Sequence, residues 1–133
     1  MNLEKVFSFI KEKKGRDYPV KYKLINGLPL KRHELYIKGH LNLSSTNITS
    51  LPDNLTVTGE LDIHRTNITS LPDNLTIGMD LDIRNTNITT LSNNLKIGGS
   101  FFLSNTPLAN IYSRDEIRNI IQDKGGFVRH IFK

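Results

Sequence analysis

The chain has 133 residues and no cysteine, which excludes disulfide bonds, thiolate zinc sites and thiol catalysis. Its formal net charge of +5 is unevenly placed, with ten Lys/Arg against four Asp/Glu in residues 1–40, three against six in 41–100, and five against three in 101–133. The basic charge therefore lies at the two ends, and it does not form a continuous stripe of the kind that follows a phosphate backbone.

The N-terminal segment predicts a short amphipathic helix. Leu3, Val6, Phe7 and Ile10 recur at helical spacing, and Gly15 follows them. We do not expect a secretory signal here, because charged residues come early and the apolar stretch is short. Since no apolar run is long enough to cross a membrane, we expect a cytoplasmic protein without membrane contact.

Residues 22–30 predict a β-hairpin. The dipeptide Asn26-Gly27 is typical of a type I′ turn between two short strands. Pro29 would place the second of these strands at a sheet edge. The alternative is an atypical first turn of the repeats that follow.

A block of twenty residues is then written three times in succession. The copies are LNLSSTNITSLPDNLTVTGE (41–60), LDIHRTNITSLPDNLTIGMD (61–80) and LDIRNTNITTLSNNLKIGGS (81–100). A fixed period of this length predicts one structural unit stacked on copies of itself, which is a solenoid. Weaker copies of the pattern extend this solenoid to residues 35–111, where Phe101, Leu103, Thr106, Leu108 and Ile111 align with the apolar and threonine columns.

The middle copy indicates what one turn contains. Residues 61–63 alternate between inward and outward positions, as in a short strand, and residues 72–74 are typical of a turn. No part of the copy has a helical period, so we expect each turn to be a parallel strand with an extended return path. Identical positions would then stack as polar ladders that bond from turn to turn. The expected ladders are Thr46, Thr66, Thr86 and Thr106, and Asn47, Asn67 and Asn87.

The C-terminal part predicts a helix and a final strand. Ser113 and Glu116 have the spacing of a capping box, and Gly125 is placed to end the helix. Residues 127–132 then form a strand whose free edge could pair two chains as a homodimer.

We therefore predict one domain in three parts. Residues 1–34 are an N-terminal helix and cap, 35–111 the solenoid, and 112–133 a C-terminal helix and strand cap. The predicted fold class is a repeat solenoid with a parallel β-sheet and turns of about 20 residues, capped by a short helix at each end.

The pattern LxIxxTxITxLPxNL resembles the leucine-rich repeats. It is most similar to the short LPX type of bacterial effector proteins and to short repeat proteins encoded in phage and bacterial genomes. Some LPX effectors carry a ubiquitin-ligase domain with a catalytic cysteine; this chain has no cysteine, so the resemblance implies binding only. The residues that carry the resemblance are Leu61, Ile63, Ile68, Leu71, Pro72 and Leu75, with their copies twenty positions away.

Two positions depart from that family pattern. Thr66 stands where the family usually has Asn. Thr58, Gly78 and Gly98 stand where it usually has Leu. The second departure makes a closed β-solenoid an alternative to an open horseshoe.

The strand column offers the first candidate site. If alternate strand residues face outwards, as the resemblance implies, they form two rows that vary while the scaffold positions stay fixed. Variation of this kind is expected of a recognition surface and also of a merely solvated face. Phe102 favours recognition, because aromatic residues and Arg are the usual anchors of interfaces, although Phe101 or Phe102 could instead pack beneath the C-terminal helix. The rows are Asn42, Asp62, Asp82 and Phe102, and Ser44, His64, Arg84 and Ser104, with Arg65 beside them; the predicted partner-binding residues are Asp62, His64, Arg65, Asp82, Arg84 and Phe102.

An acidic cluster lies in the same region. Glu60, Asp62, Asp80 and Asp82 fall in adjacent turns with His64 near them, and such groups could ligate a divalent ion or act as an acid–base pair. Their spacing puts them on the exposed side, where solvation satisfies them. We therefore expect no metal, no cofactor and no enzymatic activity.

The basic N-terminal segment is the second candidate site. Basic residues with aromatic residues between them can bind nucleic acid, but a solvated cap has the same composition. The residues of this alternative are Lys11, Lys13, Lys14, Arg16, Lys21, Lys23 and Arg32, with Tyr18, Tyr22 and Tyr36 between them.

The sequence thus favours a non-enzymatic protein–protein interaction module that holds a partner protein on the strand face or on a cap. A host-directed effector and a phage-encoded inhibitor are the two roles that the resemblance implies. The alternative function is nucleic-acid binding by the basic N-terminal segment.

Overall fold

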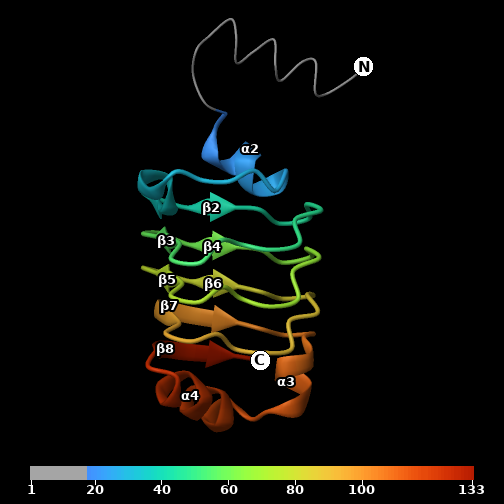
Figure 1. Ribbon diagram of the computed structural model, residues 1–133. Helices are drawn as coiled ribbons and strands as arrows, with labels where there is room; N and C mark the ends of the chain where they lie inside the picture. Colours follow the sequence, from blue (N-terminus) through green and yellow to red (C-terminus); the bar gives the residue numbers. More distant parts are fainter. Residues whose placement is uncertain (1–17) are drawn as a thin grey trace, which may run out of the picture.

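The computed structural model describes residues 18–133, in which the repeats stack as turns of a parallel β-solenoid (Figure 1). The stacking is in register, because Leu41 pairs with Leu61 and Leu61 with Leu81. The predicted repeat solenoid, with its parallel sheet and its turns of 20 residues, is confirmed. Within residues 18–133 no helix has the length and apolar character needed to cross a membrane. The helix predicted over Leu3 to Ile10 lies outside the described residues.

Short parallel strands form one sheet, which has eight strands in the described part of the chain. Most turns contribute two strands separated by a bend, and the last complete turn contributes a single longer strand. The strands are β1 (Tyr36–Ile37), β2 (Leu41–Asn42), β3 (Thr56–Val57), β4 (Leu61–Asp62), β5 (Thr76–Ile77), β6 (Leu81–Asp82), β7 (Lys96–Phe102) and β8 (Phe127–Phe132).

The bend divides the sheet into two ladders that meet in β7. One ladder runs β1-β3-β5-β7, and the other runs β2-β4-β6-β7, while β8 pairs with both halves of β7. Before the bend, the N–H of Thr58 donates to Ile37 of the preceding turn; after it, the N–H of Leu61 donates to Asp80 of the next turn. Within each ladder the N–H groups of one turn donate to one neighbouring turn and its carbonyls accept from the other, so the backbone of each inner turn is bonded on both sides.

The apolar columns of the repeat fill the interior of the solenoid. Leu61, Ile63, Ile68 and Leu75 are completely buried, and their copies in the neighbouring turns are buried with them. These side chains pack on the same positions of the next turn, so the core is shared between turns and does not belong to any one of them.

Glycine at the bend permits an approach that a side chain would block. A Cβ atom built on Gly78 would lie 2.1 Å from the carbonyl oxygen of Thr58, and one built on Gly98 would lie 2.3 Å from that of Gly78. The leucine that leucine-rich repeats usually carry at this position therefore does not fit. This close stacking of the turns explains the departure from the family pattern at Gly78 and Gly98, but not at Thr58, which carries a side chain at the same position.

The threonine column is structural, but its hydrogen bonds differ from the prediction. Thr66 Oγ1 donates to the carbonyl of Ile63 at 2.8 Å, and Thr86 Oγ1 donates to that of Ile83 at 2.7 Å. Both bonds lie within one turn, so the expected turn-to-turn ladder of threonines is wrong. The hydroxyl satisfies a carbonyl where the strand ends, which explains why Thr is repeated there.

The predicted asparagine ladder is also wrong in position. Asn47, Asn67 and Asn87 are exposed, and within residues 18–133 no side-chain hydrogen bond joins them. The ladder is instead formed by Asn54, Asn74 and Asn94, in which each amide donates to the preceding one at 2.8 and 3.1 Å. All three adopt a left-handed backbone, with φ of 64°, 59° and 58°. Asn is the side chain that tolerates this conformation best after Gly.

We expect Asn74→Ala to lower the free energy of unfolding by about 2 kcal/mol, because alanine is strained at positive φ and breaks the amide ladder. Asn67→Ala, in the same turn, should change it by less than about 0.5 kcal/mol. Urea denaturation followed by circular dichroism measures both values. Equal losses for the two variants would contradict the assignment of the ladder.

The N-terminal hairpin prediction is wrong, because residues 20–25 form helix α2 (Val20–Ile25). Asn26 and Gly27 end this helix: the N–H of Asn26 donates to Tyr22, and Gly27 has a φ of 67°. Asn-Gly suits a helix C-terminus as well as a hairpin turn, since both need positive φ. Leu24 of α2 is buried against the first turn, and a short 3-10 helix, η1 (Arg32–Leu35), leads into β1.

The C-terminal elements form a cap at the other end of the stack. Helix α4 (Arg114–Asp123) begins with the predicted capping box: Ser113 Oγ accepts from Glu116 N at 3.1 Å, and Glu116 Oε1 accepts from Ser113 N at 3.0 Å. Gly125, in the turn that follows α4, has a φ of 85°. Strand β8 has the predicted bounds.

One C-terminal prediction is wrong. Residues 107–111 were expected to follow the return path of a repeat, with Ile111 in a buried column. They form helix α3 (Pro107–Ile111) instead, and Ile111 is 64% exposed. Thr106 keeps its place in the threonine column but also caps this helix, because its Oγ1 accepts from Ala109 N at 3.2 Å.

The outer edge of β8 is partly covered by α4, which lies beneath it (Figure 1). Arg118 of α4 donates to the carbonyls of Val128 and Arg129, at 2.6 and 3.2 Å. Pairing of two chains along β8 stays a prediction.

Candidate functional site

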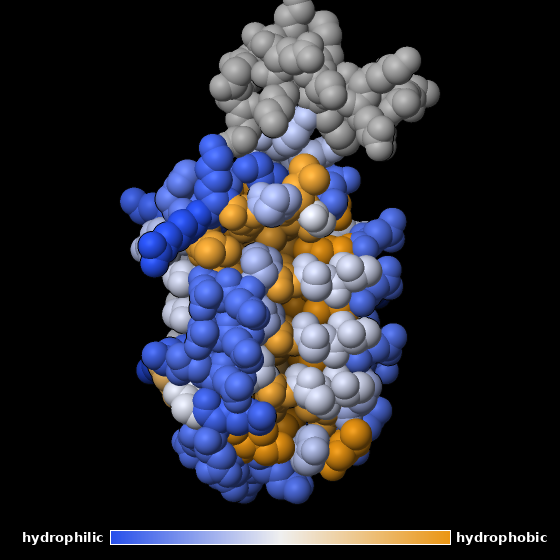
Figure 2. Space-filling model, in the orientation of Figure 1, coloured by the Kyte–Doolittle hydropathy of each residue, from blue (hydrophilic) through white to orange (hydrophobic). Residues whose placement is uncertain are grey.

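The two predicted rows lie on the outer face of the second ladder. Asn42, Asp62, Asp82 and Phe102 are successive partners in the pairing of β2, β4, β6 and β7. The pairing of β7 with β8 adds Phe132 to this column, next to Phe102. We call this surface the strand face. Figure 2 shows a column of hydrophilic side chains along the stack, a strip of hydrophobic residues beside this column, and further hydrophobic residues at both ends.

The Asn and Asp side chains of this column shape the backbone that follows each strand. Asp62 Oδ1 accepts from the N–H of His64 at 3.1 Å, and Asp82 Oδ1 accepts from the N–H of Arg84 at 3.0 Å. Asn42 makes the same bond to Ser44 at 2.9 Å. Side chains of this type close a turn on their own backbone. The repeated Asn or Asp therefore has a structural role, and it also fixes the direction of the residue two positions later.

The charged side chains of the strand face form a connected network. Asp62 Oδ1 lies 2.5 Å from His64 Nδ1, and Asp82 Oδ2 lies 3.9 Å from the same nitrogen. Arg84 holds Asp82 with two bonds, from Nε to Oδ1 at 2.9 Å and from Nη2 to Oδ2 at 2.6 Å. These hydrogen bonds and the charge of Asp82 raise the pKa of Arg84 above its ordinary value, so the guanidinium stays charged at any working pH.

The same network decides what chemistry the acidic cluster can support. Asp62, His64 and Asp82 each offer a ligand atom within 4.8 Å of the other two, a spacing that a metal ion could bridge. Both oxygens of Asp82 are already bonded to Arg84, however, and a cation placed there would meet that positive charge. The arrangement is better described as an ion-pair network on an open face than as a metal or catalytic centre.

An aromatic cluster lies at the C-terminal end of the strand face. Phe102 and Phe132 stack with ring centroids 5.3 Å apart and planes 16° apart. The guanidinium carbon of Arg84 lies 5.7 Å from the centre of the Phe102 ring, within the range of a cation–π contact. His130 lies at the edge of the cluster, its ring centre 6.5 Å from that of Phe132. Phe132 is 48% exposed, so the cluster is open to a partner.

Phe101 and Phe102 were each considered as a residue that packs beneath the C-terminal helix, and their positions in β7 decide between them. Phe101 is completely buried in the core, whereas Phe102 faces outwards and is half-buried by Phe132. Phe102 therefore does not pack beneath the C-terminal helix, and it stays a candidate for recognition.

Comparison with protein-family models, with curated proteins and with solved structures finds no match.

Arg65 is the one predicted partner-binding residue with an unusual backbone. Its φ is 55°, and the residues stacked with it in the same column are Ser45, Asn85 and Asn105, with φ of 56°, 57° and 57°. Asn105 Nδ2 also donates to Asn85 Oδ1 at 2.6 Å. Arg lacks the short polar side chain that favours a left-handed backbone, so it is less suited to this position than Asn. A residue kept at such a cost suggests a functional reason.

We expect Arg65→Asn to raise the free energy of unfolding by about 1 kcal/mol, because Asn relieves the strain and extends the ladder from Asn85. Thermal denaturation compared with that of the unaltered protein measures the gain. Arg65→Lys is the control, since it keeps the charge and the strain and should leave stability within about 0.5 kcal/mol. A destabilised Arg65→Asn protein would show that the arginine is retained for structure.

The structure reduces the number of described residues that could contact nucleic acid at the predicted N-terminal site. Lys23 is 5% exposed, and its Nζ lies 2.9 Å from Glu34 Oε1, so it is not available to a phosphate. Lys21 and Arg32 are exposed. The remaining members, Lys11, Lys13, Lys14 and Arg16, lie outside the described residues.

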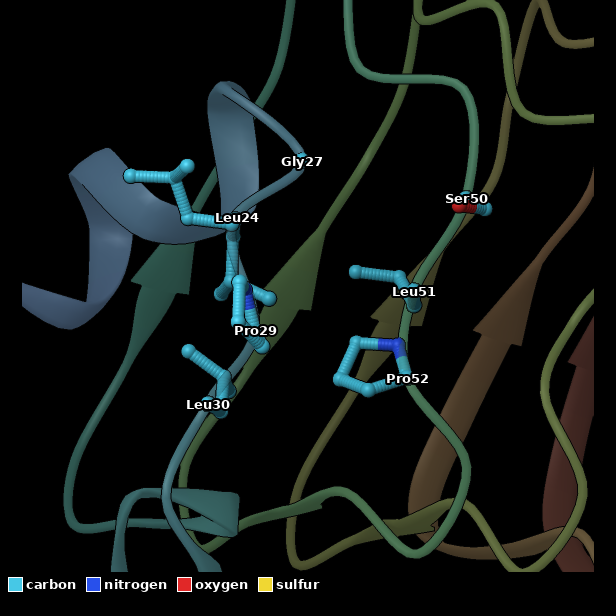
Figure 3. A pocket seen from close by; sticks show the side chains of 8 residues that line it. Leu24, Gly27, Pro29, Leu30, Ser50, Leu51 and Pro52 are labelled. Atoms are coloured by element: carbon cyan, nitrogen blue, oxygen red, sulfur yellow. The ribbon is translucent and has the colours of Figure 1, made fainter.

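A shallow apolar groove lies between the end of α2 and the first turn of the solenoid (Figure 3). Its volume is about 190 Å³, and its lining is apolar apart from Ser50. None of its lining residues is a His or a carboxylate that could activate the Ser50 hydroxyl, so the groove is suited to hold an apolar group. The lining residues are Leu24, Gly27, Leu28, Pro29, Leu30, Ser50, Leu51 and Pro52.

Sequence reasoning missed Phe132 and His130 as members of the strand face. Both lie in the predicted final strand, but α3 and α4 separate that strand from the repeats. In addition, the pairing of β7 with β8 shifts register between Ile97 and Ser100. Aligning residues 127–132 with the repeat columns, allowing for that insertion, would have placed Phe132 beside Phe102.

Proposed function

We propose that the protein is a non-enzymatic protein–protein interaction module that holds a partner protein on the strand face. The observation that carries the proposal is the open aromatic cluster of Phe102 and Phe132, with Arg84 against it. Aromatic residues and Arg supply most of the binding energy in protein interfaces. Phe132 is 48% exposed, and its burial against a partner would stabilise the complex.

Two further features support this proposal. The side chains of the strand face are held in place by bonds to their own backbone, so little conformational entropy is lost when they are covered. Arg65, beside this face, keeps a strained backbone conformation where Asn would serve the fold better. The strained backbone of Arg65 is not required for a surface that only contacts water.

The resemblance to LPX-type leucine-rich repeats suggests the setting in which such a module works. A host-directed effector and a phage-encoded inhibitor both act by stoichiometric binding of another protein. This part of the proposal rests on the repeat motif alone, because fold does not determine function.

The test is capture of a partner from host-cell lysate on the immobilised full chain, with quantitative mass spectrometry. The face variant is Arg84→Glu with Phe132→Ser, and the matched control is Asn67→Ser with Thr69→Glu on another exposed side of the same stack. We expect the unaltered chain and the control to capture the same protein, and the face variant to lose at least ten-fold of it. Absence of a specific protein, or equal capture by both variants, would refute the proposal.

Nucleic-acid binding is the second candidate, and Lys21 and Arg32 are those residues of the predicted set that the structure describes as exposed. A mobility shift at low salt that is lost in the triple variant Lys11→Glu, Lys13→Glu and Lys14→Glu would support this function. No shift at low salt would exclude it.

A further inference from the structure

We propose that the strand face selects a cationic segment that carries an aromatic or large aliphatic anchor. This inference rests on the proposed function and names the chemistry of the partner. It follows from the division of the strand face into an acidic part and an aromatic part, which lie in successive turns of one continuous surface.

The acidic part has negative charge that the protein leaves uncompensated. Glu60 and Asp80 flank the ladder that carries Asp62 and Asp82, one position outside Leu61 and Leu81. Within the described residues, neither Glu60 nor Asp80 forms a salt bridge, whereas Asp82 is neutralised by Arg84. A cationic side chain that reaches this surface would therefore meet carboxylates whose charge is still available.

The carboxylates also differ in how firmly they are held. Asp80 Oδ1 accepts from the N–H of Ser100 at 2.7 Å, which fixes the carboxylate against the backbone of the next turn. Glu60 is exposed, and within residues 18–133 no hydrogen bond or ion pair holds its carboxylate. A partner cation thus meets one carboxylate held by the backbone, that of Asp80, and one exposed carboxylate, that of Glu60.

The aromatic part gives the anchor its place. Phe102 and Phe132 present one stacked surface in the turns that follow Asp82, and Arg84 covers one side of the Phe102 ring. Stacked rings bind aromatic or large aliphatic side chains well. Arg84 is already paired with Asp82, so it does not repel a cation bound at the neighbouring acidic part as strongly as an unpaired arginine would.

The distance between turns determines how many residues separate the anchor from the basic residue in the bound segment. Neighbouring parallel strands are about 4.8 Å apart, so the turn of Glu60 lies about 14 Å from the strand that carries Phe132. An extended segment advances about 3.4 Å per residue, and this distance then corresponds to about four residues. The turn of Asp80 is one step closer. An anchor and a basic residue two to four positions apart would reach both parts of the surface.

The same charges oppose the other classes of partner. An acidic peptide or a phosphate backbone would bring negative charge next to Glu60 and Asp80. A purely apolar segment would cover the rings but leave the carboxylates desolvated without partners, which is unfavourable. A segment with both an anchor and a cation satisfies the whole surface.

The test uses a phage-displayed library of random peptides, about twelve residues long, selected on the immobilised full chain. Clones that also bind the support without protein are removed, and no clone is removed for binding a variant. We expect the surviving sequences to be enriched in Trp, Tyr, Phe or Leu with Lys or Arg two to four positions away. Synthetic copies with a fluorescent label are then measured by anisotropy against the purified variants.

The expected result is at least a ten-fold loss of affinity with Glu60→Lys/Asp80→Lys and also with Phe132→Ser. The control, Asp115→Lys/Asp123→Lys, makes the same change of net charge on the exposed surface of α4 and should alter affinity by less than two-fold. Affinity should fall between low and moderate salt, as expected of an ionic contact. Thermal melts of every variant confirm that each is folded.

Survivors without basic residues, or an affinity unchanged by the Glu60 and Asp80 substitutions, would overturn the inference. So would a selection in which no clone depends on the strand face. This inference can fail while the proposed function stands. If a captured protein partner is lost on Phe132→Ser but kept on Glu60→Lys/Asp80→Lys, the interaction module stands and the preference for a cationic segment does not.

Discussion

Phe101→Ala is expected to lower the free energy of unfolding by about 4 kcal/mol, whereas Phe102→Ala should lower it by about 1 kcal/mol. The two residues are adjacent in β7, but Phe101 is completely buried and Phe102 lies on the strand face. Removing the buried ring leaves a cavity beneath the C-terminal cap that rigid backbone ladders cannot close. Removing the outer ring loses its stacking on Phe132 and little else.

Urea denaturation monitored by circular dichroism separates the two effects. Phe101→Leu is an intermediate control, because it fills part of the cavity and should lose clearly less than the alanine variant. A larger loss for Phe102→Ala than for Phe101→Ala would mean that the two faces of β7 have been assigned the wrong way round.

Gly78→Ala is expected to lower the free energy of unfolding by about 3 kcal/mol, from the addition of a single methyl group. The new Cβ atom would lie 2.1 Å from the carbonyl oxygen of Thr58, which is backbone and cannot rotate away. The two turns would have to separate, and this would weaken the hydrogen bond from Gly78 N to Val57 O, now 2.9 Å long.

Met79→Ala is the matched control, because Met79 is the next residue in the chain and 49% exposed. It should change stability by no more than about 0.5 kcal/mol. Thermal melts of both variants give the comparison. A neutral Gly78→Ala would show that the turns can move apart at low cost, and the explanation given above for glycine at this position would then fail.

The solenoid could be predicted because the repeated sequence shows which residues of neighbouring turns stack on one another. Once residues 41–60, 61–80 and 81–100 are aligned, each buried column is fixed by identity, and Leu61 must stack on Leu41 and Leu81. The hydrogen bonds of the polar columns could not be predicted in the same way. Thr66 and Asn74 both repeat every 20 residues, but whether such a side chain bonds within its own turn or to the next depends on where the backbone turns.

The two ends were predicted less well, because no repeat constrains them. Asn26-Gly27 satisfies either a hairpin or a helix end, and only the burial of Leu24 against the first turn decides for the helix. Ile111 matches a repeat column in sequence, yet Pro107 follows Thr106 and starts a helix there, since proline suits the first helical position.

The candidate site was predicted in part. Alternation along residues 61–63 placed Asp62 on the outer face, and the structure adds that Arg84 binds both oxygens of Asp82. Phe132 was missed, because β8 returns to the sheet after two helices and pairs with β7 through a register shift between Ile97 and Ser100. Only an alignment with the repeat columns that allows for this shift places Phe132 beside Phe102.

The in-register pairing of identical turns makes the length of the stack adjustable. Leu61 bonds and packs with the turns on either side, and beyond those it has no influence. Inserting one further copy of residues 61–80 would therefore lengthen the stack by about 4.8 Å and leave both caps as they are. The distance between the N-terminal groove and the aromatic cluster therefore changes only in steps of one turn. A partner that contacts both ends would bind only a stack with the matching number of repeats.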